Sequence, residues 1–215
     1  MIVLAIETSG NVCGAAVAID GALVSSSEII RDAAHDAFLP EVVNSAIRFA
    51  DVSMEKIDIV AISAGPGSFT GLRIGASFVK GLAFGGTPRI LPVPTLTSLH
   101  VAAREVALLS GAQTITSIIP SHRDLYYLVQ APCSDVVHEQ AVSVCTAADV
   151  EARITPETFV VGPGAKHFTP TPVSGLTRLS ARFVAFASWH MLEAGVPCVD
   201  VDAFVPQYQQ DFIPR

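Results

Sequence analysis

The fold of this chain is decided by one stretch, Ser63-Ala64-Gly65-Pro66-Gly67-Ser68-Phe69-Thr70-Gly71-Leu72-Arg73-Ile74-Gly75. The apolar run 57–62 before it predicts a buried strand, and residues 70–85 predict a helix. A strand, a glycine turn and a helix start place free backbone N–H groups at one point, which suits an anion such as phosphate. The stretch matches none of the common phosphate-binding or nucleophile motifs. A tight turn whose glycines serve only packing is therefore the alternative interpretation.

Glycines recur at every fourth residue into the predicted helix. Gly67, Gly71 and Gly75 lie on one face, because residues four apart are neighbours on a helix surface. Glycine inside a helix costs about 1 kcal/mol relative to alanine. A face of glycines therefore predicts that another backbone comes very close. Apolar residues cover much of the remaining circumference, which predicts burial within the fold or against a partner chain.

Length and composition limit the classes of protein to consider. The chain has 215 residues, enough for one large domain or two small ones. Half of the residues are hydrophobic and only 15% are charged, which indicates either a surface covered by another protein or a compact enzyme. The net charge of −7 argues against autonomous binding of nucleic acid.

Cysteine usage and the N-terminal sequence predict a cytoplasmic protein. The four cysteines form no CxxC pair and are expected to be reduced: Cys13, Cys133, Cys145 and Cys198. The first residues lack the basic region of a signal peptide and are expected to form a strand. No apolar run approaches the roughly 20 residues that span a bilayer, so no membrane association is expected.

Periodicity predicts two α/β units, 1–110 and 111–215, with the same order of elements. The first is expected to hold strands at 2–6, 12–19, 23–29, 57–62 and 90–93, and helices at 38–52, 70–85 and 95–110. The second is expected to hold strands at 115–119, 125–130 and 158–161, and helices at 147–153 and 181–194. Thr95 and Ser180 are expected N-caps. A strand followed by Gly-Pro-Gly occurs in both units, at Gly65 and Gly162, although this tripeptide is common enough in loops for coincidence.

Four motifs together resemble the TsaB family, also called YeaZ: Leu4-Ala5-Ile6-Glu7-Thr8-Ser9, His35 before Leu39-Pro40, the stretch from Gly65 to Gly75, and Pro94-Thr95-Leu96. The second half matches less well. It has Pro120-Ser121-His122-Arg123-Asp124-Leu125-Tyr126 where an Asp-Ala-Arg-like element is usual, and Gln209-Gln210 where an arginine is usual. The resemblance implies duplicated subdomains of the actin, hexokinase and Hsp70-like class, with mixed sheets flanked by helices.

The resemblance also implies a function, in making threonylcarbamoyladenosine beside the anticodon of tRNA. It implies a degenerate paralogue of the catalytic subunit TsaD that pairs with TsaD. The small ATPase TsaE would join them, tRNA would bind only through the complex, and a homodimer would form when TsaD is absent. Helices 38–52 and 70–85 would form the contact, through Val42, Ala46, Phe49, Gly71, Gly75, Ala76, Phe78, Val79 and Leu82. An alternative from another class is a nucleotide-dependent enzyme of the same superfamily that acts on its own.

Catalytic and metal sites are expected to be absent. TsaD-like catalysis needs two histidines at i and i+4 on the first helix, and this chain has His35 and Leu39 at those positions. One imidazole beside a carboxylate is a poor metal site, because a catalytic metal typically has three protein ligands. His35 is instead expected to be a hydrogen-bonded residue of a loop or helix start. No cofactor is expected, although a vestigial phosphate loop that binds ATP or ADP weakly would comprise Glu7, Thr8, Ser9, Gly65, Gly67 and Ser68.

Overall fold

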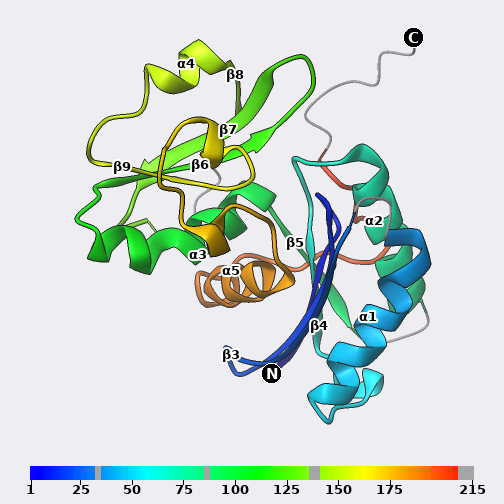
Figure 1. The fold of residues 1–215 in the computed structure, drawn as a ribbon. Helices are drawn as coiled ribbons and strands as arrows, with labels where there is room; N and C mark the ends of the chain where they lie inside the picture. Colours follow the sequence, from blue (N-terminus) through cyan, green and yellow to red (C-terminus); the bar gives the residue numbers. More distant parts are fainter. Residues whose placement is uncertain (32–34, 85–87, 136–140, 208–215) are drawn as a thin grey trace.

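The computed structural model describes residues 1–31, 35–84, 88–135 and 141–207 of the chain. These residues form two sheets with helices between and around them (Figure 1). The first sheet has the strand order β3-β2-β1-β4-β5. Its strands are β1 (Ile2–Glu7), β2 (Val12–Ile19), β3 (Ala22–Ile30), β4 (Ile59–Ser63) and β5 (Arg89–Val93). β1 to β3 are antiparallel, whereas β4 and β5 run parallel to β1.

β1 is the central strand, as its apolar sequence predicts. Successive side chains of a strand point to opposite faces, so a strand with cover on both faces must be apolar throughout. Leu4 and Ile6 enter the core beneath the helices α1 (His35–Phe49) and α2 (Phe69–Ala83), whereas Val3 and Ala5 enter the core beneath α5 (Ala181–Glu193). The hairpin that joins β2 to β3 turns at Asp20 and Gly21. Both residues have positive φ, as two-residue hairpin turns require.

The second sheet has the strand order β8-β7-β6-β9. Its strands are β6 (Thr114–Pro120), β7 (Leu125–Pro132), β8 (Ser143–Thr146) and β9 (Thr158–Val161), and α4 (Ala147–Glu151) follows β8. The short helices η1 (Met54–Lys56), η2 (Ala165–His167) and η3 (Ser174–Leu176) complete the set of helices in the described residues. β6 pairs parallel with β9 and antiparallel with β7, so each sheet is mixed.

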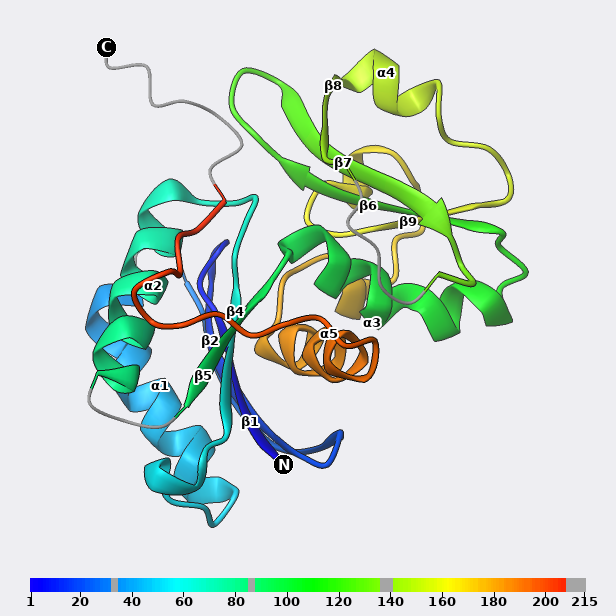
Figure 2. The ribbon, with the colours of Figure 1, turned by 180° about the vertical axis from the view of Figure 1, so that it is seen from behind.

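Two helices lie between the sheets (Figures 1 and 2). α3 (Thr95–Leu109) follows the first sheet in sequence, but its Leu99 and Ala103 pack in the core of the second. α5 follows the second sheet but packs on the first. After α5 the chain returns along the first sheet, where Val199 pairs with Ile90 at the edge of β5 and Phe204 enters the core beneath α1 and α2. The division at residues 110 and 111 stays a prediction.

Some local expectations need correction. Pro94, not Thr95, holds the N-cap of α3, and Thr95 is the first helical residue. Ser180 does cap α5, because its Oγ accepts a hydrogen bond from the Arg182 N–H at 3.2 Å. β8 was not expected, because the sequence Ser143-Val144-Cys145-Thr146 forms no apolar run like those at 90–93 and 158–161. It forms because the edge of β7 offers backbone partners to it.

Several predicted boundaries also differ. α1 begins and ends three residues before the expected helix 38–52, and α2 covers 69–83 instead of 70–85, with residue 85 outside the described residues. β4 begins at Ile59, because η1 and the residues after it occupy the approach to the strand. Such differences are ordinary, since the ends of elements depend on caps and packing.

Candidate functional site

The glycine turn, the β1–β2 turn and the start of α3 meet at one point. The Ser68 N–H donates to the Ser9 carbonyl at 2.7 Å, and the Thr95 N–H donates to the Gly65 carbonyl at 2.8 Å. The Thr95 hydroxyl donates to the Ser9 hydroxyl at 3.3 Å. The structure therefore brings together the six residues predicted as a vestigial phosphate loop, because β1 and β4 are neighbours in the sheet and end at the same edge.

Glu7 is the ionisable group at the centre of this cluster, and it is fully buried. Its Oε1 accepts hydrogen bonds from the Ser9 N–H at 2.5 Å, the Ser9 hydroxyl at 2.6 Å and the Ser63 hydroxyl at 3.1 Å. Its Oε2 has no partner in the described structure. Burial raises the pKa of Glu7 from 4.5 to about 7, although these hydrogen bonds oppose the shift. The carboxyl is thus partly protonated near neutral pH.

The glycine face of α2 packs on the chain's own backbone. A Cβ added to Gly67 would overlap the Ser9 carbonyl oxygen, and one added to Gly71 would overlap the Thr8 carbonyl oxygen. At Gly75 it would overlap the Thr8 hydroxyl. The predicted close approach is present, but the backbone that approaches is the β1–β2 turn of the same chain. The spacing of these glycines therefore does not require a partner subunit.

Three N–H groups at the glycine turn are used within the chain. Besides Ser68, the Gly71 N–H donates to the Ser68 hydroxyl at 3.2 Å and the Leu72 N–H donates to the Ser68 carbonyl at 2.9 Å. For these three residues the expectation of free N–H groups is wrong. The helix start is capped by Ser68 itself, so these donors are not available to an anion.

Two other segments cover this cluster. Gly65 has a φ of +112°, and the Gln207 carbonyl lies where a side chain at Gly65 would begin. The Gln207 N–H donates to the Ala64 carbonyl at 2.8 Å. On the β1–β2 turn, a Cβ at Gly10 would come within 2.7 Å of the Leu179 side chain. Glu7, Thr8 and Ser9 are consequently out of contact with solvent.

The second Gly-Pro-Gly turn is closed in a similar way. Gly162 has a φ of +104°, and a Cβ there would overlap the Ile118 carbonyl oxygen. The Gly162 N–H donates to the Leu176 carbonyl at 2.7 Å. Both turns thus pack against backbone of the same chain after a strand.

His35 is the first residue of α1 and is buried, while Leu39 lies in the apolar core one turn later. Burial lowers the pKa of His35, although hydrogen bonding to backbone of Val12 and Gly10 opposes the shift. The imidazole is therefore neutral at physiological pH, and its Nε2 has no partner in the described structure. Throughout residues 1–31, 35–84, 88–135 and 141–207, no three side chains of His, Cys, Asp or Glu are grouped so as to hold a metal ion.

The residues predicted as a partner interface differ in their exposure. Six are buried within the single chain: Val42, Ala46, Gly71, Gly75, Ala76 and Val79. Phe78 and Leu82 are half-buried, and Phe49 is 64% exposed. The sequence analysis missed Phe69 and Phe84, which are 42% and 87% exposed. Both phenylalanines can be noticed in the sequence, at the start of α2 and directly after it, but their exposure depends on how α2 sits on the sheet.

A half-buried acidic residue that the sequence analysis missed is Glu28, on β3. Its Oε1 accepts hydrogen bonds from the Ser180 hydroxyl at 2.5 Å and the Ala181 N–H at 2.9 Å. The carboxylate therefore sits at the N-terminus of α5, where negative charge is stabilising. This contact ties the edge strand of the first sheet to the helix that lies between the sheets.

A sequence model of the TsaD family, tRNA N6-adenosine threonylcarbamoyltransferase, matches residues 28–183. The chain belongs to this family. It is 30% identical over 127 residues to the tRNA threonylcarbamoyladenosine biosynthesis protein TsaB of Haemophilus influenzae, an alignment that covers 59% of this chain and 52% of the relative. It is 29% identical over 181 residues to the tRNA N6-adenosine threonylcarbamoyltransferase of Staphylococcus aureus, covering 76% of this chain and 53% of that enzyme. The chain spans about half the length of these TsaD-family relatives.

Solved structures confirm the fold class. A Pseudomonas aeruginosa protein described as similar to the peptidase YeaZ superposes with a TM-score of 0.76 at 24% identity, over 97% of this chain and 99% of that chain. YeaZ from the same organism superposes with a TM-score of 0.74 at 25% identity, over 96% and 99%. The α/β fold with two mixed sheets and the resemblance to TsaB and YeaZ are thus confirmed. In the described part of the chain, no helix has the length and apolar character needed to cross a membrane.

Proposed function

We propose that the chain is a non-catalytic subunit required for threonylcarbamoylation of tRNA adenosine beside the anticodon, and that it pairs with a TsaD-type catalytic subunit. The observation that carries the proposal is the closed cluster around Glu7. The turn that would bind phosphate in a working nucleotide site lies against the chain's own Thr8 and Ser9 carbonyls, and Gln207 lies against its Gly65. A catalytic nucleotide cleft needs donors that are open to the ligand.

The arrangement around His35 supports the same proposal. Leu39 replaces the second histidine of the expected metal pair and lies in the core, where it packs with the residues beneath α1 and α2. His35 therefore has no imidazole partner one turn along the helix. A metal held by this pair would lack the three protein ligands that catalytic sites typically use.

The exposed phenylalanines of α1 and α2 supply a candidate contact surface. Phe49 on α1 is 64% exposed, Phe69 at the start of α2 is 42% exposed, and Phe84 directly after α2 is 87% exposed. The Arg48 guanidinium lies 5.1 Å from the Phe49 ring centre, and the Arg73 guanidinium lies 5.4 Å from that of Phe69. Aromatic residues and arginines are enriched in protein interfaces. This surface would bind the TsaD-type subunit or, in its absence, a second copy of this chain.

The remaining parts of the proposal follow from the same assignment. TsaE would join the pair, tRNA would bind only through the complex, and the protein would work in the cytoplasm. No cofactor is required, although weak binding of ATP or ADP is compatible with the role. The alternative, an independent nucleotide-dependent enzyme, requires that the cluster around Glu7 open to solvent.

Reconstitution tests the proposed role. The purified chain is incubated with tRNA and threonylcarbamoyl adenylate, with and without the TsaD-type protein of the same organism, and the modified nucleoside is measured by mass spectrometry. We expect product only when the TsaD-type protein is present. Product formed by the chain alone would contradict the proposal. Calorimetry with ATP and Mg²⁺ distinguishes the non-catalytic subunit from the independent enzyme. Saturable binding with turnover would favour the independent enzyme.

A matched pair of variants tests the contact surface. Phe49→Asp removes an exposed ring from α1, and Leu109→Asp makes the same kind of change at the end of α3, where the side chain is 83% exposed. Burying a phenylalanine typically stabilises by about 1.5–3 kcal/mol, so we expect Phe49→Asp to weaken TsaD binding at least tenfold. Leu109→Asp should bind as the parent does. Equal binding by both variants would place the contact elsewhere.

A further inference from the structure

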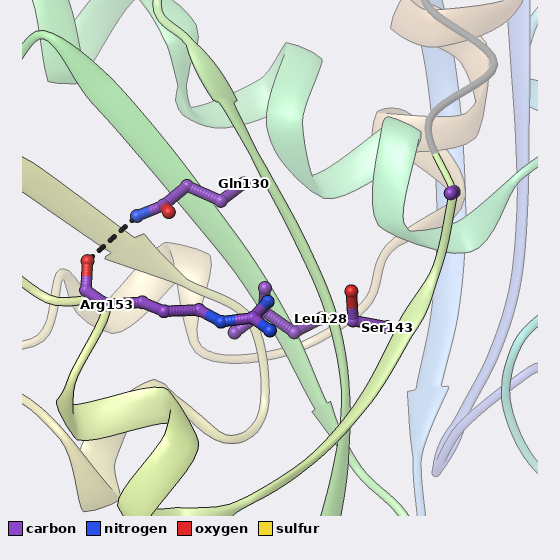
Figure 3. Close-up of a pocket in the computed structure, with 5 residues that line it drawn as sticks. Leu128, Gln130, Ser143 and Arg153 are labelled. Atoms are coloured by element: carbon purple, nitrogen blue, oxygen red, sulfur yellow. Dashed lines mark hydrogen bonds between the residues drawn. The ribbon is translucent and has the colours of Figure 1, made fainter.

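A pocket on the second sheet lies apart from the glycine turn. It has a volume of about 410 Å³ and is lined by Leu128, Gln130, Ala141, Ser143 and Arg153. Figure 3 shows the Arg153 side chain extending toward Leu128 and Ser143, with Gln130 on the neighbouring part of β7. The pocket forms where β8 begins, because Ser143 pairs with Leu128 and the preceding residues, 141 and 142, have left the sheet.

The polar groups of the pocket have defined roles. The Gln130 Nε2 donates to the Thr116 hydroxyl and to the Arg153 carbonyl, both at 3.0 Å. These two bonds use both N–H groups of the amide, which leaves its Oε1 as an acceptor. They also fix the backbone of Arg153 against β7. The lining is therefore mainly polar, and it combines one amide acceptor, the Ser143 hydroxyl and the five N–H donors of a guanidinium.

The Arg153 guanidinium makes no hydrogen bond or ion pair with another residue in the described part of the chain. The acidic residue whose pKa its charge lowers is Asp149, four residues before it, while Glu151, two residues before it, is exposed. The Asp149 Oδ2 accepts hydrogen bonds from the Thr146 hydroxyl at 2.7 Å and the Thr146 N–H at 3.0 Å. These bonds chiefly lower the pKa of Asp149, and the positive charge of Arg153 adds to the effect. Asp149 is thus committed to capping α4 and leaves the guanidinium unpaired.

We propose that this pocket binds a carboxylate carried on a short stem beside an amide N–H, as in an N-acylated amino acid or an acidic side chain of a peptide. The guanidinium fork matches a carboxylate in a bidentate geometry. The Gln130 Oε1 accepts the amide N–H. A monoanion fits better than a phosphate dianion, because the pocket offers one cation and Asp149 lies close by in sequence. The site does not depend on the role proposed for the glycine turn.

The test uses isotope-labelled full-length protein and three small probes at constant ionic strength. N-acetylglycine carries both groups, N-acetylglycinamide lacks the carboxylate, and propionate lacks the amide. Backbone N–H signals of Leu128, Gln130 and Ser143 and the side-chain Nε–H signal of Arg153 are followed by NMR. We expect saturable shifts with N-acetylglycine, at least fivefold weaker binding of N-acetylglycinamide, and intermediate binding of propionate.

Variants distinguish the pocket from general anion binding. Arg153→Gln should abolish the saturable shifts, whereas Arg48→Gln, on the exposed face of α1, should leave them unchanged. Ser143→Ala should weaken binding while Arg153 is retained. Linear shifts, or equal shifts in Arg153→Gln and the parent, would overturn the proposal.

A blocked tripeptide, Ala-Glu-Ala, identifies the source of the carboxylate. If the tripeptide binds several-fold more tightly than N-acetylglycine, the natural ligand is an acidic peptide segment. If N-acetylglycine binds as tightly or more tightly, it is a free N-acylated acid. Failure of both to give saturable shifts would contradict the site itself, and reconstitution of tRNA modification would be unaffected.

Discussion

Replacing Glu7 by glutamine should remove the contribution of this carboxyl to the pH dependence of the free energy of unfolding. The carboxyl has a pKa of about 7 in the folded chain, where burial disfavours its charged form, against 4.5 ordinarily. Below pH 4.5 the carboxyl is protonated in both the folded and the unfolded state. Its ionisation therefore does not lower the free energy of unfolding at these pH values. Between pH 4.5 and 7 the unfolded state loses the proton first, and stability falls as pH rises.

The magnitude follows from the two pKa values. A difference of one pKa unit corresponds to about 1.4 kcal/mol, so the full penalty above pH 7 is about 3 kcal/mol. Between pH 5 and pH 8 the folded state should lose about 2.5 kcal/mol through Glu7 alone, since part of the loss occurs below pH 5. His35 has the opposite sign, because burial lowers its pKa and disfavours folding at acid pH.

The assay is urea unfolding of the parent and of Glu7→Gln at pH 5, 6, 7 and 8. The difference between the two proteins isolates Glu7, because other titrating groups are common to both. We expect the parent to lose about 2.5 kcal/mol more than the variant from pH 5 to pH 8. Glu105→Gln, an exposed change on α3, is the control and should follow the parent. If the difference in unfolding free energy between the parent and Glu7→Gln changes by less than about 1 kcal/mol from pH 5 to pH 8, the pKa assigned to Glu7 is wrong.

Further predictions concern packing and capping. Gly71→Ala should destabilise by about 1–3 kcal/mol or more, because its Cβ would overlap the Thr8 carbonyl oxygen. Gly81→Ala, in the same helix but with nothing within 4 Å of the added Cβ, should stabilise by about 0.5–1 kcal/mol. Thermal and urea unfolding of both variants measure these effects, and equal effects of like sign would contradict the packing. Ser180→Ala should cost about 1–2 kcal/mol, because it removes the α5 cap and a hydrogen bond to Glu28; no loss in the same assay would contradict that role.

The sequence by itself determined most of the local structure. β1 is apolar on both of its faces, which predicted that it is the central strand. A strand that is covered on both faces has no solvent-exposed face and needs no polar residues. Asp20-Gly21 is a dipeptide that favours a two-residue hairpin turn, because both positions need positive φ. The spacing of Gly67, Gly71 and Gly75 predicted a close backbone approach, since only a missing Cβ makes room for one. These properties depend on neighbours within a few residues along the chain.

Only the tertiary structure decided what fills each space. The backbone against the glycine face is the β1–β2 turn, about 60 residues away in sequence. Gln207 and Leu179 close the cluster around Glu7, and the edge of β7 turns residues 143–146 into a strand. The exposure of Phe84 and the pocket beside Arg153 likewise follow from how helices and loops settle on the sheets. Periodicity records which side of an element is apolar, but non-local packing selects the partner, and no pattern along one segment encodes that choice.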